Sequence, residues 1–191
     1  MVETYFKRAR RYASDCYVAD YTDKTSSGRG VEISEEPFDD IDYFHLKKHS
    51  GLAITYVGVN FEEHTSFIKG IQNCECMFVS KSDKGKPWLM MLEMKYCESD
   101  NIERYTYKAY TQMRETFDKV EREGVLQAKD YRRYFVYSVP EHTDKIPFGE
   151  FTRSQNDTLR QYEEEGIKLI GNNRMLIATP QYLFEPKRSV L

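Results

Sequence analysis

The chain of 191 residues is 40% hydrophobic and 31% charged, with a formal net charge of −3. This apolar content suffices for one domain with a sizeable core and excludes the profile of a disordered chain. The negative net charge excludes a polycation that binds nucleic acid by bulk charge alone, but it does not exclude a local basic surface. No stretch approaches the roughly 18 apolar residues of a membrane span, so no membrane partner is expected.

The start of the chain and its four cysteines favour a reducing compartment. Residues 1–11 are charged and lack an apolar run, so we expect no secretory leader there and a cytoplasmic location. Cys74 and Cys76 are two positions apart, which is not the spacing of a zinc knuckle, and no second pair completes a site. Packed thiols are therefore expected ahead of structural zinc.

The first sixty residues carry weak signals of secondary structure. Basic and aromatic residues alternate over residues 1–21, which is typical of a helix or an irregular arm, and the polar residues 22–30 predict an exposed loop. Apolar spacings of three and four predict a short amphipathic helix within residues 31–50. Residues 51–60 are rich in β-formers and predict a strand.

The signals become stronger in the middle of the chain. Short strands are predicted at residues 66–71 and 74–80, and the polar residues 81–87 contain Asp, Gly and Pro, which predicts a hairpin turn. Residues 88–97 form an almost unbroken apolar run. Such a run is typical of a central strand that is covered on both faces.

A long amphipathic helix is predicted next. Asp100 or Asn101 can cap its start and Gly124 can end it, and apolar residues recur between them at helical spacing. Residues 131–139 predict a strand, and residues 154–165 predict a second helix.

The order of the elements predicts an α/β protein with a mixed β-sheet flanked by helices. The last two predicted strands, residues 167–170 and 174–179, are expected to pair as a hairpin. We expect a single domain, residues 1–191, with an N-terminal extension at 1–50, a core at 51–180 and a tail at 181–191.

Two charged residues interrupt the apolar run at 88–97. Glu93 and Lys95 are two positions apart, so their side chains share one face of a strand. If the turn makes the two strands neighbours, Glu75 approaches Glu93 across the sheet. Two close carboxylates repel each other unless one is protonated or a cation lies between them, and Mg²⁺ or Mn²⁺ suits such oxygen ligands. An internal salt bridge to Lys95 is the competing interpretation.

This arrangement resembles the PD-(D/E)XK nuclease superfamily, which includes restriction endonucleases and Holliday-junction resolvases. The resemblance covers residues 67–139 and consists of an acidic residue on one strand, a short turn, a strand ending in Glu-x-Lys and a long helix. It implies a restriction endonuclease-like fold, in which a helix, three strands, a helix and a strand carry the site. The chain departs from the pattern in having Glu75 where Asp is more frequent, and in lacking the Pro-Asp pair.

The resemblance also implies roles for particular residues. Glu75 and Glu93 would be catalytic metal ligands, joined by the carbonyl of Met94, and Lys95 would be catalytic by positioning the nucleophilic water and stabilising charge. Glu63 is the expected additional metal ligand. Glu62, Glu35 and Glu36 compete with Glu63 for this role. Weaker candidates for polar site residues on the long helix are Tyr105, Lys108 and Gln112.

The expected function is hydrolysis of phosphodiester bonds in nucleic acid, with DNA favoured over RNA and with Mg²⁺ or Mn²⁺ as cofactor. A homodimer is compatible with cutting both strands of a duplex. Phosphate contacts are expected from Lys81, Lys84, Lys86, Arg132 and Arg133.

Two alternatives stay open. One is a nuclease-like binding module without catalysis, and the other is a protein-interaction domain with an aromatic, acidic surface. His45 and His49 have the four-residue spacing of a metal pair but lack a matched third ligand. No glycine-rich phosphate loop or serine nucleophile elbow is present in the sequence.

Overall fold

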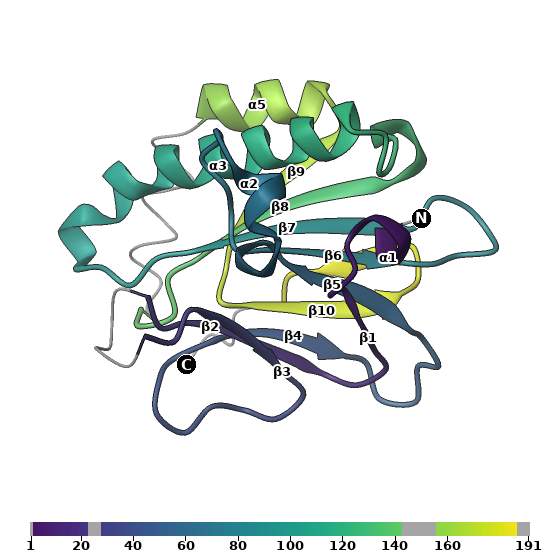
Figure 1. The fold of residues 1–191 in the computed structure, drawn as a ribbon, viewed down its shortest axis with the longest axis horizontal. Coiled ribbons are helices and arrows are strands. Elements are labelled where there is room, and N and C mark those ends of the chain that lie inside the picture. The colour runs from purple at the N-terminus through teal and green to yellow at the C-terminus, as the bar shows by residue number, and fades with distance from the viewer. Residues whose placement is uncertain (1, 23–27, 143–155, 187–191) are drawn as a thin grey trace.

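The structure is a computed structural model that describes residues 2–22, 28–142 and 156–186. It is an α/β fold in which two mixed β-sheets are stacked and helices cover the outer face of the larger sheet (Figure 1). Within the described residues, no helix is both long and apolar enough to cross a membrane.

The larger sheet has six strands in the order β1-β5-β6-β7-β8-β9. The neighbours from β1 to β7 are antiparallel, whereas β7, β8 and β9 run parallel. Parallel neighbours need crossover connections, and the helices α3 and α5 provide them. The strands are β1 (Arg10–Tyr12), β5 (Tyr56–Asn60), β6 (Cys76–Ser80), β7 (Trp88–Met94), β8 (Arg132–Ser138) and β9 (Ile167–Gly171).

The smaller sheet has five strands in the order β11-β10-β4-β2-β3. Only β10 and β4 are parallel in it. Its strands come from both ends of the chain, so described residues of the expected extension and of the expected tail belong to this sheet. The strands are β2 (Cys16–Asp20), β3 (Val31–Ser34), β4 (Phe44–Lys48), β10 (Arg174–Thr179) and β11 (Tyr182–Phe184).

The helices are short except for α3 (Ile102–Arg122), which lies across the larger sheet. The other α-helices among the described residues are α1 (Val2–Tyr5), α2 (Thr65–Ile68) and α5 (Asn156–Glu164). Three 3₁₀ turns complete the described part of the fold: η1 (Phe61–His64), η2 (Ser99–Asn101) and η3 (Ala128–Asp130).

Two hydrophobic clusters hold the layers together. One lies between the helices and the larger sheet, and the other lies between the two sheets. Strand β7 contributes to both clusters: Leu89 and Met91 pack on the helix side, and Trp88 and Met90 pack against the smaller sheet. All seven residues of β7 are buried, which confirms the predicted central strand covered on both faces.

The middle of the chain folds largely as predicted. Strands occur within residues 51–60, 74–80 and 131–139, and the 81–87 turn joins β6 to β7 as an antiparallel hairpin. The long helix starts after Asn101, although the Asn101 side chain makes no capping hydrogen bond, and Gly124 follows its end with φ of 69°.

Four predictions of secondary structure are wrong. Residues 10–20 contain two strands where a helix or irregular arm was expected. The helix within residues 31–50 is absent, because Phe44 and Leu46 alternate with partly exposed residues and form a strand. Residues 65–68 form a helical turn and not a strand. Finally, β9 and β10 do not pair, because β9 joins the larger sheet and β10 the smaller one.

Candidate functional site

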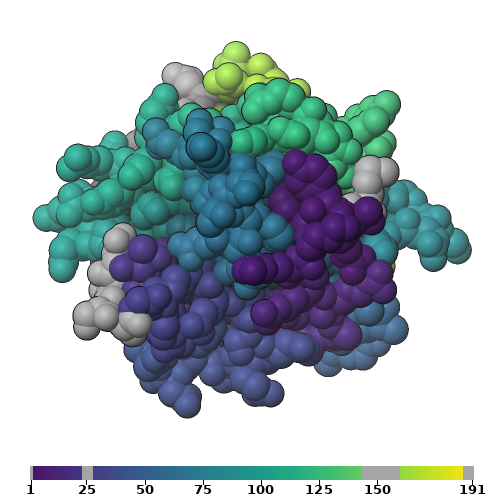
Figure 2. All heavy atoms as spheres, viewed as in Figure 1, coloured from purple at the N-terminus to yellow at the C-terminus, as the bar shows by residue number. Residues whose placement is uncertain are grey.

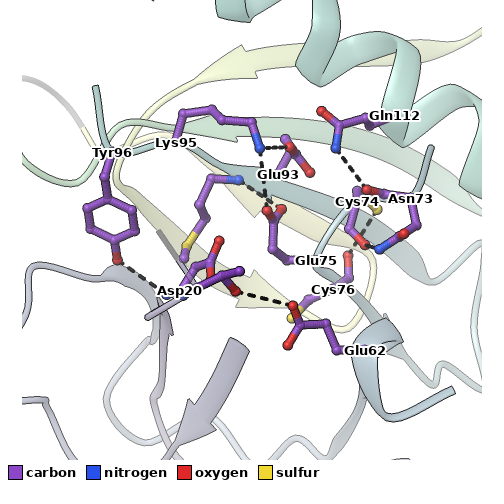
Figure 3. Close-up of polar contacts among 12 residues, drawn as sticks. Asp20, Glu62, Asn73, Cys74, Glu75, Cys76, Glu93, Lys95, Tyr96 and Gln112 are labelled. Carbon is purple, nitrogen blue, oxygen red and sulfur yellow. Dashed lines mark hydrogen bonds and ion pairs between the residues drawn. The ribbon is translucent and has the colours of Figure 1, made fainter. Parts of the chain in front are cut away.

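Glu75 and Glu93 meet on neighbouring strands near the end of β7. Cys76 pairs with Leu92, so the antiparallel register places Glu75 opposite Glu93 (Figure 3). The two residues are only 7% and 0% exposed, respectively. The two carboxyl groups meet as the sequence predicted, although Glu75 lies just before β6 and not within a strand that starts at residue 74.

Lys95 follows directly after β7 and brings its ammonium group to both carboxyl groups. Its Nζ forms an ion pair with Glu93 Oε1 and lies 3.7 Å from Glu75 Oε1. Its backbone N–H donates to the carbonyl of Ser138 at 3.0 Å, which keeps this position in line with β8. The Lys95 side chain is 20% exposed, so it is the most solvent-accessible of the three.

Burial governs the ionisation of the two carboxyl groups. It raises the pKa of Glu93 well above its ordinary value, and the adjacent Glu75 charge adds to the effect. Burial also raises the pKa of Glu75, while the hydrogen bond with Glu93 and the charge of Lys95 oppose it. The pair therefore holds a proton to a higher pH than isolated glutamates do.

Lys95 stays protonated in this setting. Burial alone lowers the pKa of Lys95, but the charges of Glu75 and Glu93 outweigh it and raise the pKa above its ordinary value. An ammonium group held in this way can stabilise negative charge, and it is a poor base at neutral pH.

Asp20 is an acidic neighbour that the sequence interpretation missed. It ends β2 in the smaller sheet, lies beside Glu75 in Figure 3, and its charge raises the pKa of both Glu75 and Lys95. Its backbone N–H donates to the Tyr96 hydroxyl at 3.3 Å. A charge at the end of the short apolar run of β2 is the signal that could have found it.

Glu62 and Glu63 are adjacent in η1, but their side chains contact different parts of the protein. Glu62 Oε2 accepts a hydrogen bond from the backbone N–H of Val31 at 2.7 Å, and Glu62 lies on the Asp20 side of the site (Figure 3). Glu63, the expected additional ligand, has its Oε1 3.9 Å from Arg10 Nη2. The structure therefore brings Glu62 and not Glu63 toward the carboxyl pair.

The other acidic competitors lie elsewhere. Glu35 accepts a hydrogen bond from the hydroxyl of Ser14, and Glu36 is exposed. Both follow the end of β3 that pairs with Tyr17, so they lie at the opposite end of β2 from Asp20.

Met94 and the long helix contribute mainly through backbone and amide groups. The backbone N–H of Met94 donates a hydrogen bond to Glu75 Oε2 at 3.0 Å. The expected contribution of Met94 was its carbonyl, as a metal ligand, whereas the structure shows its N–H in contact with the site. Gln112 donates to the carbonyl of Asn73 at 2.9 Å. Tyr105 is half-buried in the core, and Lys108 is exposed on α3.

The five predicted phosphate-binding residues gather far from the carboxyl pair. Lys81, Lys84 and Lys86 are exposed in the turn before β7. Arg132 and Arg133 begin β8 and pair with the first two residues of β7. At about 3.3 Å per residue, the five steps from Trp88 to Glu93 span roughly 16 Å.

The remaining candidates do not form a metal site. His45 Nε2 lies 2.9 Å from Asp15 Oδ2, whereas the His49 ring contacts the carbonyl of Ser50. All four cysteines are free thiols, with Cys74 and Cys76 buried. Across residues 2–22, 28–142 and 156–186, no three His, Cys, Asp or Glu side chains are grouped to hold a metal ion.

The donor set at the carboxyl pair nevertheless suits a hard divalent cation. Neither oxygen of Glu93 accepts a hydrogen bond from a backbone amide of the described residues, so Lys95 is the cation that compensates its charge. Glu75 and Glu93 would be the two ligands, and Lys95 would have to move aside from between them.

Comparisons of the chain with protein-family models, with curated proteins and with solved structures find no match.

Proposed function

We propose that the protein is a metal-dependent nuclease that hydrolyses phosphodiester bonds, with DNA favoured over RNA. The observation that carries the proposal is the buried pair Glu75 and Glu93, with the Lys95 ammonium between them, at the end of the central strand. Buried carboxyl groups this close are costly without a cation, and their cost is offset where they bind one.

The connectivity around the site supports a restriction endonuclease-like core. Strands β5, β6 and β7 form an antiparallel meander, α3 follows, and β8 pairs parallel with β7. This gives the expected order of three strands, a helix and a strand. The fold departs from the expected core because η1 and α2 lie between its first two strands, and not before the first.

The chemistry would be divided between the ion and the chain. A divalent ion held by Glu75 and Glu93 would supply Lewis acidity and lower the pKa of a bound water. Lys95, which stays protonated, would stabilise the negative charge that develops on the phosphate. Glu75 is the less buried carboxyl group, and its carboxylate would accept the proton of the attacking water.

Cleavage assays test this function. Purified protein with Mn²⁺ should cleave labelled single-stranded or duplex DNA, or RNA, and Glu93→Gln should abolish the activity. Glu63→Gln changes an acidic residue paired with Arg10, away from the site, and should leave cleavage intact. The proposal fails if the wild-type protein cleaves none of these substrates and Glu93→Gln leaves Mn²⁺ binding unchanged.

One observation favours a second candidate function, a nuclease-like binding module without catalysis. Glu93 has no solvent exposure, and Lys95 already compensates its charge, so the site is complete without a metal. Calorimetric titration with Mn²⁺ separates the two candidates. Binding of nucleic acid with no Mn²⁺ heat above background would favour the module.

A further inference from the structure

A basic groove lies at the opposite end of the larger sheet from the Glu75–Glu93 pair. It has a volume of about 380 Å³ and is formed by η3, the start of β8, the end of α5, the start of β9 and the turn before β7. Figure 2 shows the 81–87 turn projecting at one edge of the molecule and the start of α3 at the opposite edge. The charged residues that line the groove are Lys86, Lys129, Arg132, Arg133, Lys168 and Glu163.

The charge of this groove contrasts with that of the whole chain. Five cationic side chains and one carboxylate line it, whereas the chain carries a net charge of −3. Four of the cations, Lys86, Lys129, Arg132 and Lys168, have no acidic partner within ion-pair distance among the described residues. Uncompensated like charges repel one another, so their concentration in a groove favours an anionic ligand.

Arg133 differs from these four cations because it is partly buried. Its Nη2 donates to the carbonyl of Glu165, and its Nε is buried without a partner among the described residues. Gly166, which closes α5, leaves room for it: a Cβ at this glycine would lie 3.3 Å from Arg133 Nη2. Arg133 is therefore held as a fixed positive charge in the floor of the groove.

Exposed aromatic rings stand at the rim of the basic groove. The guanidinium of Arg132 lies 4.3 Å from the centre of the Tyr182 ring. Tyr182 stacks on Phe184, with ring centres 6.2 Å apart and planes 17° from parallel. The two residues are 39% and 50% exposed. The Tyr134 hydroxyl, from a residue that lines the groove, accepts a hydrogen bond from the backbone N–H of Leu183 at 3.4 Å, which fixes β11 at this rim.

We propose that the basic groove and the Tyr182–Phe184 pair together bind a single strand of nucleic acid. The four cations without an acidic partner would contact successive phosphates, and unpaired bases would stack on the exposed rings. A duplex hides its base faces, so the ring pair favours a single strand. The inference rests on the proposed function in taking nucleic acid as the ligand, and it adds an anchoring surface roughly 16 Å from the carboxyl pair.

The rings distinguish this ligand from other anionic partners. An anionic lipid surface would use the cations but would have no planar groups to stack on Tyr182 and Phe184. The combination of a cationic track with a stacking platform is typical of surfaces that bind single strands.

Binding measurements test the phosphate contacts. Fluorescence anisotropy with a labelled 20-nucleotide oligothymidylate is carried out in EDTA, so that no metal-dependent cleavage occurs. The double substitution Lys129→Glu and Lys168→Glu should weaken binding by about tenfold or more and reduce the dependence of affinity on salt. The matched control, Arg104→Glu with Lys108→Glu, makes the same charge change on exposed positions in the first half of α3 and should weaken binding by less than about twofold.

A second pair of variants tests the stacking platform. Tyr182→Ala should weaken binding of the oligothymidylate by about fivefold or more, with a much smaller effect on a duplex of equal length. Tyr107→Ala removes another exposed aromatic ring, on α3, and should have no effect. Thermal melting of each variant shows that the fold is retained.

The outcomes separate this inference from the proposed hydrolysis. Glu93→Gln should bind the oligothymidylate like the wild-type protein, because the carboxyl pair lies outside the groove. Binding that depends on Lys129 and Lys168, without any cleavage in Mn²⁺, would overturn the hydrolysis and leave this inference standing. Equal binding by the wild type and the Lys129→Glu/Lys168→Glu variant would overturn the inference that the groove binds a single strand. Binding of phosphatidylserine vesicles without binding of the oligonucleotide would overturn it as well.

Discussion

The backbone N–H of Met94 donates a hydrogen bond to Glu75 Oε2 at 3.0 Å, and this bond fixes the carboxyl group against the neighbouring strand. Because Met94 lies between Glu93 and Lys95 in the sequence, this bond fixes the position of Glu75 relative to both of these residues. The arrangement is therefore set by the backbone pairing of β6 and β7. A site organised in this way can be probed by single substitutions that leave the strands in place.

The first prediction concerns the carboxyl group of Glu93. Glu93→Gln keeps the shape of the side chain but removes one charged oxygen ligand, so Mn²⁺ affinity should fall at least about tenfold. At about pH 4, where Glu93 carries its proton, the free energy of unfolding should change by less than about 1 kcal/mol, because neither the protonated carboxyl group nor the glutamine amide is charged. Calorimetric titration and urea unfolding measure the two quantities.

Glu63→Gln is the matched control for Glu93→Gln. It removes a carboxylate from η1, where Glu63 faces Arg10, and should leave the Mn²⁺ titration unchanged. If Glu93→Gln titrates like the wild type, the carboxyl pair is not the metal site.

The second prediction concerns the charge of Lys95. Lys95→Met keeps the length of the side chain but leaves Glu75 and Glu93 without a cation. The free energy of unfolding at neutral pH should fall by about 3–5 kcal/mol, the cost typical of breaking a buried ion pair. Combining it with Glu93→Gln removes part of the repulsion and should recover some of that loss in urea unfolding experiments.

Lys108→Met serves as the control for Lys95→Met. Lys108 is exposed on α3, so the same chemical change there should shift the free energy of unfolding by less than about 0.5 kcal/mol. A Lys95→Met variant as stable as this control would show that Lys95 does not compensate the buried carboxyl groups.

The third prediction is a dependence of stability on pH. The pKa of Glu93 is raised in the folded protein, so above the ordinary glutamate pKa of about 4.3 the folded state keeps a proton that the unfolded state loses. The stabilisation from this group is therefore fully present below that pH and declines as the pH rises toward the raised pKa. The pKa of Glu75 is also raised, so its contribution has the same sign.

A comparison of the wild type with Glu93→Gln isolates this contribution. Without divalent metal, the wild-type free energy of unfolding should fall relative to that of the variant as the pH increases from about 4 to 8. The lowered pKa of Asp15 acts equally in both proteins and cancels in the difference. A difference that is constant with pH would show that Glu93 ionises like an exposed glutamate.

Local patterns in the sequence were sufficient to predict the centre of the candidate site. The alternation of Glu93 and Lys95 and the turn before Trp88 define a strand face and its neighbour, and both depend on residues close in sequence. The charge at the end of the apolar run of β2 marks Asp20, but local patterns could not predict that it lies at this site. It reaches the site because β2 pairs with β4 and β4 pairs with β10, and β10 lies more than a hundred residues further along the chain.

The hairpin predicted from residues 167–170 and 174–179 failed for a similar reason, because strand pairing depends on residues distant in sequence. Residues 171–173 have the composition of a turn, and strands do flank them. However, each strand finds a better partner elsewhere: Ile170 pairs with Val136 in the larger sheet, and Met175 pairs with Leu46 in the smaller one. Turn composition predicts that the chain changes direction, and it does not determine which strands then pair.

The fourth prediction concerns Asn173, where the chain crosses between the sheets. Its Oδ1 accepts from the Ser138 hydroxyl at 2.9 Å and from the backbone N–H of Val139 at 2.8 Å. Its Nδ2 donates to the carbonyls of Val139 and His142 at 2.9 and 2.8 Å. These bonds fix the end of β8, and the Ser138 carbonyl there holds the backbone N–H of Lys95.

Asn173→Ala leaves the buried Ser138 hydroxyl and the Val139 N–H without a partner, so the free energy of unfolding should fall by about 2–4 kcal/mol in urea. Hydrogen exchange at the Lys95 amide should also become faster, because its acceptor is less firmly held. The matched control is Asn172→Ala, which loses a single side-chain bond to the N–H of Arg174 and should cost less than about 1 kcal/mol. If the two variants are equally stable, Asn173 does not anchor β8, and the position of Lys95 must be set by β7 alone.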